Sequence, residues 1–130
     1  MKIEYIDRIE KIDWSSVRSL FDSVGWTGRQ EKDIEESFSS SSFVRFAYSN
    51  KTLVACGRTV GDSRYYSWIV DLAVLPRFQH SGIGTQILKY LSNDLSKIKN
   101  VSLVASSEVE NFYRKNGWIK QNDLTMRLER

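Results

Sequence analysis

The sequence has few of the residues that support cross-linked or membrane-spanning folds. It contains one cysteine and one proline in 130 residues. The cysteine, Cys56, has no partner for a disulfide within the chain. No apolar run approaches the roughly 18 residues that a transmembrane helix needs, and the first residues lack the apolar segment of a signal peptide. We therefore expect a cytoplasmic location and no membrane partner.

Long runs of one charge are also missing. Lys and Arg number 19 against 16 Asp and Glu, which gives a net charge of +3. The basic residues are interspersed with the acids, so the sequence gives little support for a nucleic-acid partner. Hydrophobic residues make up 41% of the chain, as in an ordinary globular protein. The length favours a single domain spanning residues 1–130.

The most informative segment runs from Trp68 to Leu95 and changes its hydrophobic period in the middle. Residues 68–75 are nearly all apolar, which predicts a strand buried on both faces. The only proline and a tight turn with two glycines follow. Beyond the turn, apolar residues recur at helical spacing, at Ile83, Ile87, Leu88, Leu91 and Leu95.

A strand, a glycine-containing turn and a helix in this order form a suitable site for phosphate. The first N–H groups of a helix have no partner within the helix, and the helix dipole adds positive potential there. Gly82 and Gly84 let a phosphate oxygen approach the backbone. The segment is not the dinucleotide-binding pattern, because Ile87 occupies its third glycine position, and no Gly-Lys-Ser/Thr of a P-loop follows.

The remaining patterns predict an α/β fold, a mixed sheet with helices on its faces. Asp13 is suited to cap the first helix and Gly25 to end it, and residues 39–42 read as a serine-rich connection. The expected order is β-α-α-β-β-β-α-β-α-β-β. Strands are expected at 2–7, 43–48, 52–60, 65–75, 101–106, 118–120 and 124–128, and helices at 13–24, 32–38, 82–95 and 108–116.

Two motifs in this order resemble those of one enzyme family. Gln79, Gly82 and Gly84 fill the defined positions of a Q/R-x-x-G-x-G/A signature. Residues 112–118, Phe-Tyr-Arg-Lys-Asn-Gly-Trp, are similar to an F-Y-x-K-x-G-F ending, with Trp in the last place. Both belong to the GNAT superfamily of acetyl-CoA-dependent N-acetyltransferases, whose element order the chain also resembles. Identity at the level of motifs is confined to residues 70–91 and 101–118.

The resemblance implies that acetyl-CoA is a co-substrate and suggests which residues contact it. The thioester is expected beside backbone N–H groups of a bulged strand that parts from its neighbour, and the pantetheine near Ser106, where family members often carry Asn. Tyr113 is the implied general acid for the coenzyme A thiolate; the alternative is a tyrosine packed on the core. The expected backbone contacts are Leu72, Ala73 and Val74 for the thioester and Gln79, His80, Ser81, Gly82, Ile83, Gly84 and Thr85 for the pyrophosphate.

Asp71 is the candidate base for the acceptor amine. The amine arrives as an ammonium, and forming the free amine at pH 7 costs roughly 4.6 kcal/mol. A carboxylate in an otherwise apolar strand is costly unless it is used or paired. The open alternative is a structural Asp71 satisfied by backbone N–H groups or by an arginine such as Arg58.

Trp26 follows the first predicted helix, in a region that borders the acceptor site in relatives. It is a candidate wall of the acceptor pocket, or a tryptophan that closes the core. Cys56 is expected to be a small core residue, not a nucleophile.

Taken together, the sequence predicts direct transfer of an acetyl group to a primary amine, that of a small molecule, in a ternary complex. The alternatives are a protein lysine or N-terminal acetyltransferase and a non-catalytic acyl-CoA sensor. No metal is expected. A homodimer is expected from the strand edge at the C-terminus.

Overall fold

The computed structural model describes residues 2–130. Its five strands form one mixed sheet in the order β1-β2-β3-β4-β5, antiparallel throughout except for the parallel pair β4 and β5. The strands are β1 (Glu4–Ile6), β2 (Val44–Ser49), β3 (Thr52–Gly61), β4 (Tyr66–Val74) and β5 (Asn100–Ser102). The helices are α1 (Trp14–Ser23), α2 (Glu31–Ser40), α3 (Ile83–Asp94) and α4 (Glu110–Lys115), with short 3₁₀ turns at Pro76–Phe78 and Ser107–Val109.

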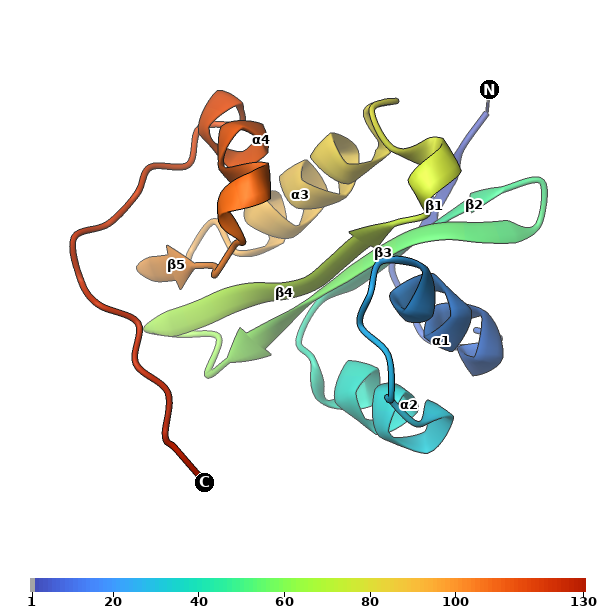
Figure 1. The fold of residues 1–130 in the computed structure, drawn as a ribbon, viewed down its shortest axis with the longest axis horizontal. Helices are drawn as coiled ribbons and strands as arrows, with labels where there is room; N and C mark the ends of the chain where they lie inside the picture. The colour runs from blue at the N-terminus through green and yellow to red at the C-terminus, as the bar shows by residue number, and fades with distance from the viewer. Residues whose placement is uncertain (1) are drawn as a thin grey trace.

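Helices cover both faces of the sheet. Figure 1 shows α1 and α2 on one face and α3 and α4 on the other. Each face has its own hydrophobic core, the first centred on Phe21, Phe38 and Phe46 and the second on residues of α3 such as Ile87 and Leu91. The central strands supply side chains to both cores, which explains their long apolar runs.

Several local predictions are confirmed. Asp13 caps α1 by accepting a hydrogen bond from the Ser15 N–H at 3.1 Å. Gly25 follows the helix with a φ of 90°, the left-handed conformation in which glycine commonly ends a helix. The hairpin between β2 and β3 turns at Asn50 and Lys51, both with positive φ.

Helix α2 extends further than expected, to Ser40, so the serine cluster is only partly a connection. The hydroxyls of Ser39 and Ser40 donate to the carbonyls of Glu35 and Ser37 within the helix. Serine can bond the preceding turn in this way, and composition alone does not reveal it.

The two strands predicted at 118–120 and 124–128 do not form, and this correction is the main departure from the expected element order. Residues 119–130 donate or accept no backbone hydrogen bond within the described chain. A strand exists only when another strand pairs with it, and alternating side chains do not supply that partner. Figure 1 shows this segment leaving α4 and running along the outside of the molecule.

No helix among residues 2–130 is long and apolar enough to cross a bilayer.

Candidate active site

The turn before α3 adopts the geometry that its glycines predict. Gly82 is the N-cap of α3 with a φ of 89°, and a Cβ added there would meet no atom within 4 Å. At Gly84, two residues later, an added Cβ would lie 3.4 Å from Val74 and 3.5 Å from Phe112. Gly82 is therefore required by its backbone conformation, whereas Gly84 leaves the backbone of the first helical turn uncovered.

The N-terminus of α3 fits a phosphate group. No side chain caps this helix end, and the backbone N–H groups of residues 80–85 donate to no other residue in the described chain. These free donors lie at the positive end of the helix dipole. All six residues, His80, Ser81, Gly82, Ile83, Gly84 and Thr85, are among those expected from the sequence to bind the pyrophosphate, and the side chain of His80 is exposed.

Gln79 takes a different place in this turn. Its backbone N–H donates to the Pro76 carbonyl at 3.2 Å, and its side-chain amide donates to the Val74 carbonyl at 3.0 Å. The side-chain bond ties the turn to the end of β4, and the backbone bond closes the 3₁₀ turn at Pro76–Phe78. We attribute to Gln79 the positioning of the turn, not a direct contact with phosphate.

Strands β4 and β5 pair over a short distance only. Three register pairs join them, from Tyr66–Asn100 to Trp68–Ser102. Beyond Ser102 the chain leaves the sheet, so residues 69–74 have no strand partner on that side. This explains why most of the run from Trp68 to Leu75 is only half-buried, with Ile69 and Ala73 alone fully buried, contrary to the expectation of burial on both faces.

A β-bulge lies in the part of β4 that pairs with β3 but not with β5. Cys56 of β3 pairs with Ala73, and Arg58 pairs with Val70, so Gly57 faces both Asp71 and Leu72. Asp71 has a φ of 57°, an uncommon value for a residue other than glycine. A bulge re-aims the side chains beside it, and here it turns the Asp71 carboxylate toward α2. Leu72, Ala73 and Val74 follow directly in the chain. They lie in the part of β4 that has no β5 strand beside it.

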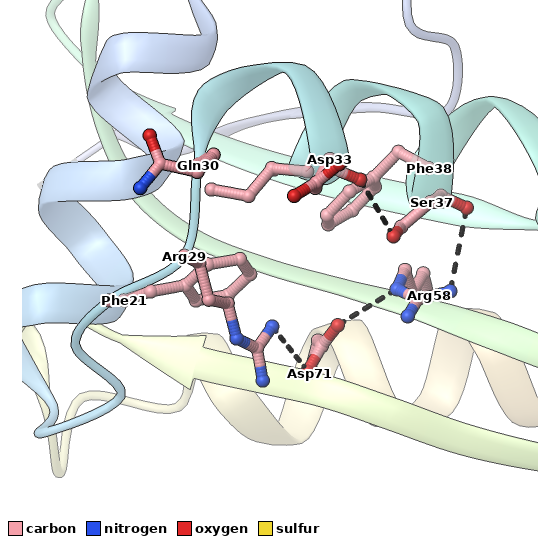
Figure 2. A pocket seen from close by; sticks show the side chains of 10 residues that line it. Phe21, Arg29, Gln30, Asp33, Ser37, Phe38, Arg58 and Asp71 are labelled. Carbon is pink, nitrogen blue, oxygen red and sulfur yellow. Dashed lines mark hydrogen bonds and ion pairs between the residues drawn. The ribbon is translucent and has the colours of Figure 1, made fainter.

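Asp71 is held by two arginines. The Arg29 guanidinium donates to one carboxylate oxygen at 2.9 Å and the Nε of Arg58 donates to the other at 2.8 Å. The Asp71 side chain is 10% exposed and that of Arg58 15%, whereas Arg29 is 40% exposed. Figure 2 shows the carboxylate between the two guanidinium groups. The arginine pairing left open from the sequence is therefore present, and it involves Arg29 as well as Arg58.

The ion-paired cluster forms one wall of a cavity of about 390 Å³ between α2 and the sheet. Figure 2 shows Asp33 of α2 on the wall that faces Arg29. The cavity is lined by Phe21, Gly28, Arg29, Gln30, Asp33, Ile34, Ser37, Phe38, Arg58 and Asp71. It therefore combines two guanidinium groups, two carboxylates and aromatic rings within one small volume.

Trp26 does not line this cavity. Its ring packs against Phe21 at 5.6 Å between centroids, and the Arg29 guanidinium lies over both rings. Stacking of this kind restricts a guanidinium. Trp26 thus lies behind the cavity wall and positions Arg29, which is part of that wall.

The lining residues Phe21, Asp33 and Phe38 were not predicted from the sequence, whereas Arg29 lies in the loop after the first helix that was expected to border the acceptor site. The pairing of Arg58 with Asp71 has a signal in the sequence, because they are single opposite charges in two otherwise apolar strand segments, 52–60 and 68–75. Adjacent antiparallel strands bring such charges together.

Tyr113 lies on the opposite face, in α4. Its ring packs edge-on against Phe112 at 4.9 Å and Trp118 at 6.4 Å, and its hydroxyl makes no hydrogen bond to another residue within 2–130. Burial raises the pKa of the Tyr113 phenol above its usual value of about 10. The phenol therefore keeps its proton at neutral pH, as a proton donor must.

Ser106 precedes α4 and is exposed, with its hydroxyl bonded to no residue of the described chain.

Cys56 is fully buried, and burial raises the pKa of its thiol far above its usual range. Its Sγ lies 3.5 Å from the Asp71 carbonyl oxygen. The prediction of a small core residue is confirmed. Within residues 2–130, no three His, Cys, Asp or Glu side chains gather in a metal-binding arrangement.

Comparison with known proteins agrees with this architecture. Residues 40–120 match the family described as Acetyltransferase (GNAT) domain. The uncharacterized N-acetyltransferase ycf52 of Porphyra purpurea is 30% identical over 129 residues, which cover 95% of this chain and 74% of that protein. The chloroplastic GCN5-related N-acetyltransferase 1 of Arabidopsis thaliana is 30% identical over 118 residues, covering 88% of this chain and 60% of its own length.

A solved structure has the same fold. The GNAT-family acetyltransferase from Streptococcus pneumoniae TIGR4 superposes with a TM-score of 0.81 at 25% identity, over 98% of this chain and all of that one. The names of these three proteins identify no acceptor amine.

Proposed function

The chain belongs to the GNAT family of N-acetyltransferases, and we propose that it transfers an acetyl group from acetyl-CoA to a primary amine of a small molecule by direct attack in a ternary complex. One observation carries this proposal. The unpaired, bulged end of β4 lies between the free N–H groups of α3 on one face of the sheet and the charged cavity on the other. Donor and acceptor can therefore approach residues 71–74 from opposite faces.

The donor side uses the backbone. The N–H groups of residues 80–85 would bind the pyrophosphate of acetyl-CoA, and Ser106 offers a free hydroxyl to the pantetheine. Bound acetyl-CoA supplies an activated acyl group. Backbone N–H groups among Leu72, Ala73 and Val74 would stabilise the negative charge that develops on its carbonyl oxygen.

Direct transfer is favoured over an acetyl-enzyme. The only cysteine has a buried thiol whose pKa burial raises, so it is a poor nucleophile. The phenol of Tyr113 carries its proton at neutral pH and would donate it to the departing thiolate.

A small acceptor is favoured by the size of the cavity. A volume of about 390 Å³ is typical of small-molecule sites. Asp71 would meet the amine at the bottom of this cavity, either as the base or as the group that fixes Arg29 and Arg58. Acetylation of a protein lysine or N-terminus is the competing assignment.

The test is release of free thiol from acetyl-CoA with a panel of small amines and lysine peptides of matched charge. We expect turnover with one or more small amines and less than a tenth of that rate with any peptide. Turnover confined to peptides would replace the small molecule by a protein acceptor. Binding of acetyl-CoA without turnover for any amine would indicate a sensor.

Location and assembly complete the proposal. We propose a cytoplasmic protein on the basis of its sequence, although several relatives are named as chloroplastic. Cell fractionation of the source organism tests this. We also propose a homodimer, because the outer edge of β5 has no neighbouring strand in the described chain.

A further inference from the structure

The cavity between α2 and the sheet presents polar groups, although aromatic rings line it. Its apolar lining residues, Phe21, Ile34 and Phe38, are only 0–3% exposed. The Arg29 guanidinium lies over the Phe21 ring, 4.6 Å from its centroid. The Arg58 guanidinium lies over the Phe38 ring at 5.7 Å. The rings therefore support the two guanidinium groups, and a ligand in the cavity would meet mainly charged and polar atoms.

The two arginines differ in how many of their donors are in use. Arg58 is 15% exposed and donates to Asp71 from Nε and to the Ser37 carbonyl and Ser41 hydroxyl from Nη1. Arg29 is 40% exposed and donates to Asp71 from Nη1, whereas its Nε and Nη2 donate to no residue of the described chain. These two nitrogens form one edge of the planar guanidinium, and such an edge matches the two oxygens of a carboxylate.

Asp33 supplies the opposite charge. It lies in the first turn of α2, its side chain is exposed, and it forms no ion pair with any residue between 2 and 130. Figure 2 shows it on the wall that faces Arg29. Arg58 and Asp71 neutralise each other, so the cavity holds one available cation, Arg29, and one available anion, Asp33.

From this charge pattern we infer that the acceptor is a zwitterionic amino acid. Its carboxylate binds the free edge of Arg29, and its ammonium is attracted by Asp33. Because Arg29 is itself bonded to Asp71, a carboxylate held there brings the rest of the acceptor beside the bulged end of β4. The inference rests on the proposed function, since it names the acceptor class for the same cavity.

The charges of the cavity favour a carboxylate over other anions and over a second amine. Two arginines and two aspartates are its only charged lining residues, so they balance. An amino acid carries one charge of each sign and preserves this balance. A diamine would leave Arg29 without a partner, and a phosphate group, with a charge of about −1.5 to −2 at pH 7, would add uncompensated negative charge beside the two carboxylates.

The test is isothermal titration calorimetry on the protein saturated with coenzyme A, which has no acetyl group to transfer. The probes are pairs of an amino acid and its decarboxylated amine, from glycine to ε-aminocaproate and including phenylalanine. At least one amino acid should bind at least about tenfold more tightly than its decarboxylated amine, because the amine leaves the charged donors of Arg29 without a partner. Diaminoalkanes and aminoalkyl phosphates of the same length should bind less tightly than that amino acid.

Arg29→Gln assigns the carboxylate to this side chain. It should weaken binding of the preferred amino acid at least about tenfold and change that of the decarboxylated amine less than about threefold. The amine is the internal control, since it reports any disturbance of Asp71. Arg29→Lys should restore only part of the preference, because an ammonium keeps the charge without the fork.

Arg18→Gln is the matched control for Arg29→Gln. Arg18 is 41% exposed and pairs with Glu31 at 3.9 Å, but it does not line the cavity. Its replacement removes the same charge and should leave the preference for the amino acid unchanged.

Asp33→Asn tests the other end of the acceptor. It should weaken binding of the amino acid and of its decarboxylated amine by the same factor, about two- to fivefold for an exposed ion pair, because both carry the ammonium.

Four results would overturn the inference: no binding of any amino acid at millimolar concentrations, equal affinity within every pair, tighter binding of a diamine or phosphate, or equal weakening of both probes by Arg29→Gln. Thiol release with the same pairs separates this inference from the enzymatic assignment. Turnover of the decarboxylated amines as fast as the amino acids would refute the acceptor class and keep the acetyltransferase. Carboxylate-dependent binding without thiol release would keep the carboxylate site and refute the proposed function.

Discussion

Asp71 shows how one residue combines strain, charge and burial. A carboxylate with 10% exposure in a strand is stable here because two guanidinium groups take one oxygen each. Its φ of 57° costs conformational free energy that the surrounding ion pairs and the bulge must offset. Strain of this kind concentrates at functional sites, and here it adjoins the residues proposed to bind the thioester.

Asp71→Asn separates the two roles of this residue. The loss of charge leaves Arg58 and Arg29 with one neutral acceptor, so we expect the free energy of unfolding to fall by about 1–3 kcal/mol. If Asp71 is the base, kcat should also fall about 10²–10⁴-fold. Urea unfolding and steady-state kinetics check both expectations.

Arg58→Gln is the control for Asp71→Asn, since it breaks the same pair and keeps the carboxylate. An equal loss of kcat in both variants would assign Asp71 a positioning role only.

Tyr113→Phe tests the general acid. The hydroxyl makes no hydrogen bond within the described chain, so its removal should leave the melting temperature nearly unchanged. General acids contribute about 10²–10⁴-fold to the rate, and we expect kcat to fall at least about 100-fold in the thiol-release assay.

The pH profile gives an independent check on Tyr113. A proton donor loses activity as pH rises through its pKa, and burial raises the pKa of Tyr113. The alkaline loss of kcat should therefore lie above pH 10. An alkaline limb near pH 8, retained in Tyr113→Phe, would assign the proton to another group.

At the scale of elements, the site depends on how two segments end. Strand β4 continues for six residues beyond its last pair with β5, from Ile69 to Val74. Helix α3 begins without a side-chain cap. Both ends leave backbone groups without partners. Backbone groups of this kind are rarely left unpaired in a folded protein unless water or a ligand binds them.

Gly82→Ala tests the glycine turn. Alanine at a φ of 89° is strained, and we expect a loss of about 1 kcal/mol in stability. The distorted turn should also raise KM for acetyl-CoA at least about fivefold with little change in kcat, as steady-state kinetics would reveal.

Gly25→Ala is the matched control for Gly82→Ala. Gly25 has a φ of 90° and likewise no atom within 4 Å of an added Cβ, but it ends α1, away from the turn. It should lower stability equally and leave KM unchanged; equal KM effects in the two variants would refute the phosphate role of the turn.

At the scale of the whole molecule, the sheet separates the two proposed substrate sites. One core lies under α1 and α2 and the other under α3, so each face can be shaped for one ligand. Binding on the α3 face should stabilise the entire fold, because small single domains unfold as one unit.

Acetyl-CoA at 100 times its Kd should stabilise the fold by about 2.7 kcal/mol, or about 10 °C in Tm for a chain of this size. Differential scanning calorimetry measures this shift. Pantetheine at the same concentration lacks the pyrophosphate and should give less than about a third of it; an equal shift would contradict binding at the turn.

The sequence by itself determined the helices and inner strands, because hydrophobic period and capping residues act over a few neighbours. Asp13, Gly25 and the turn at Asn50 and Lys51 are of this kind. The glycine turn was likewise predictable, since Gly82 must adopt a conformation that other residues avoid.

Only the tertiary structure decided the pairing of Asp71 with both Arg29 and Arg58, the place of Trp26 behind the cavity, and the unpaired state of residues 119–130. These features depend on contacts between segments distant in the chain. Arg29 lies 42 residues from Asp71, and a side chain cannot reveal along the sequence which distant group it meets. The alternation at Leu124, Met126 and Leu128 predicted a strand, but a strand also needs a partner, and that partner is a property of the folded and assembled molecule.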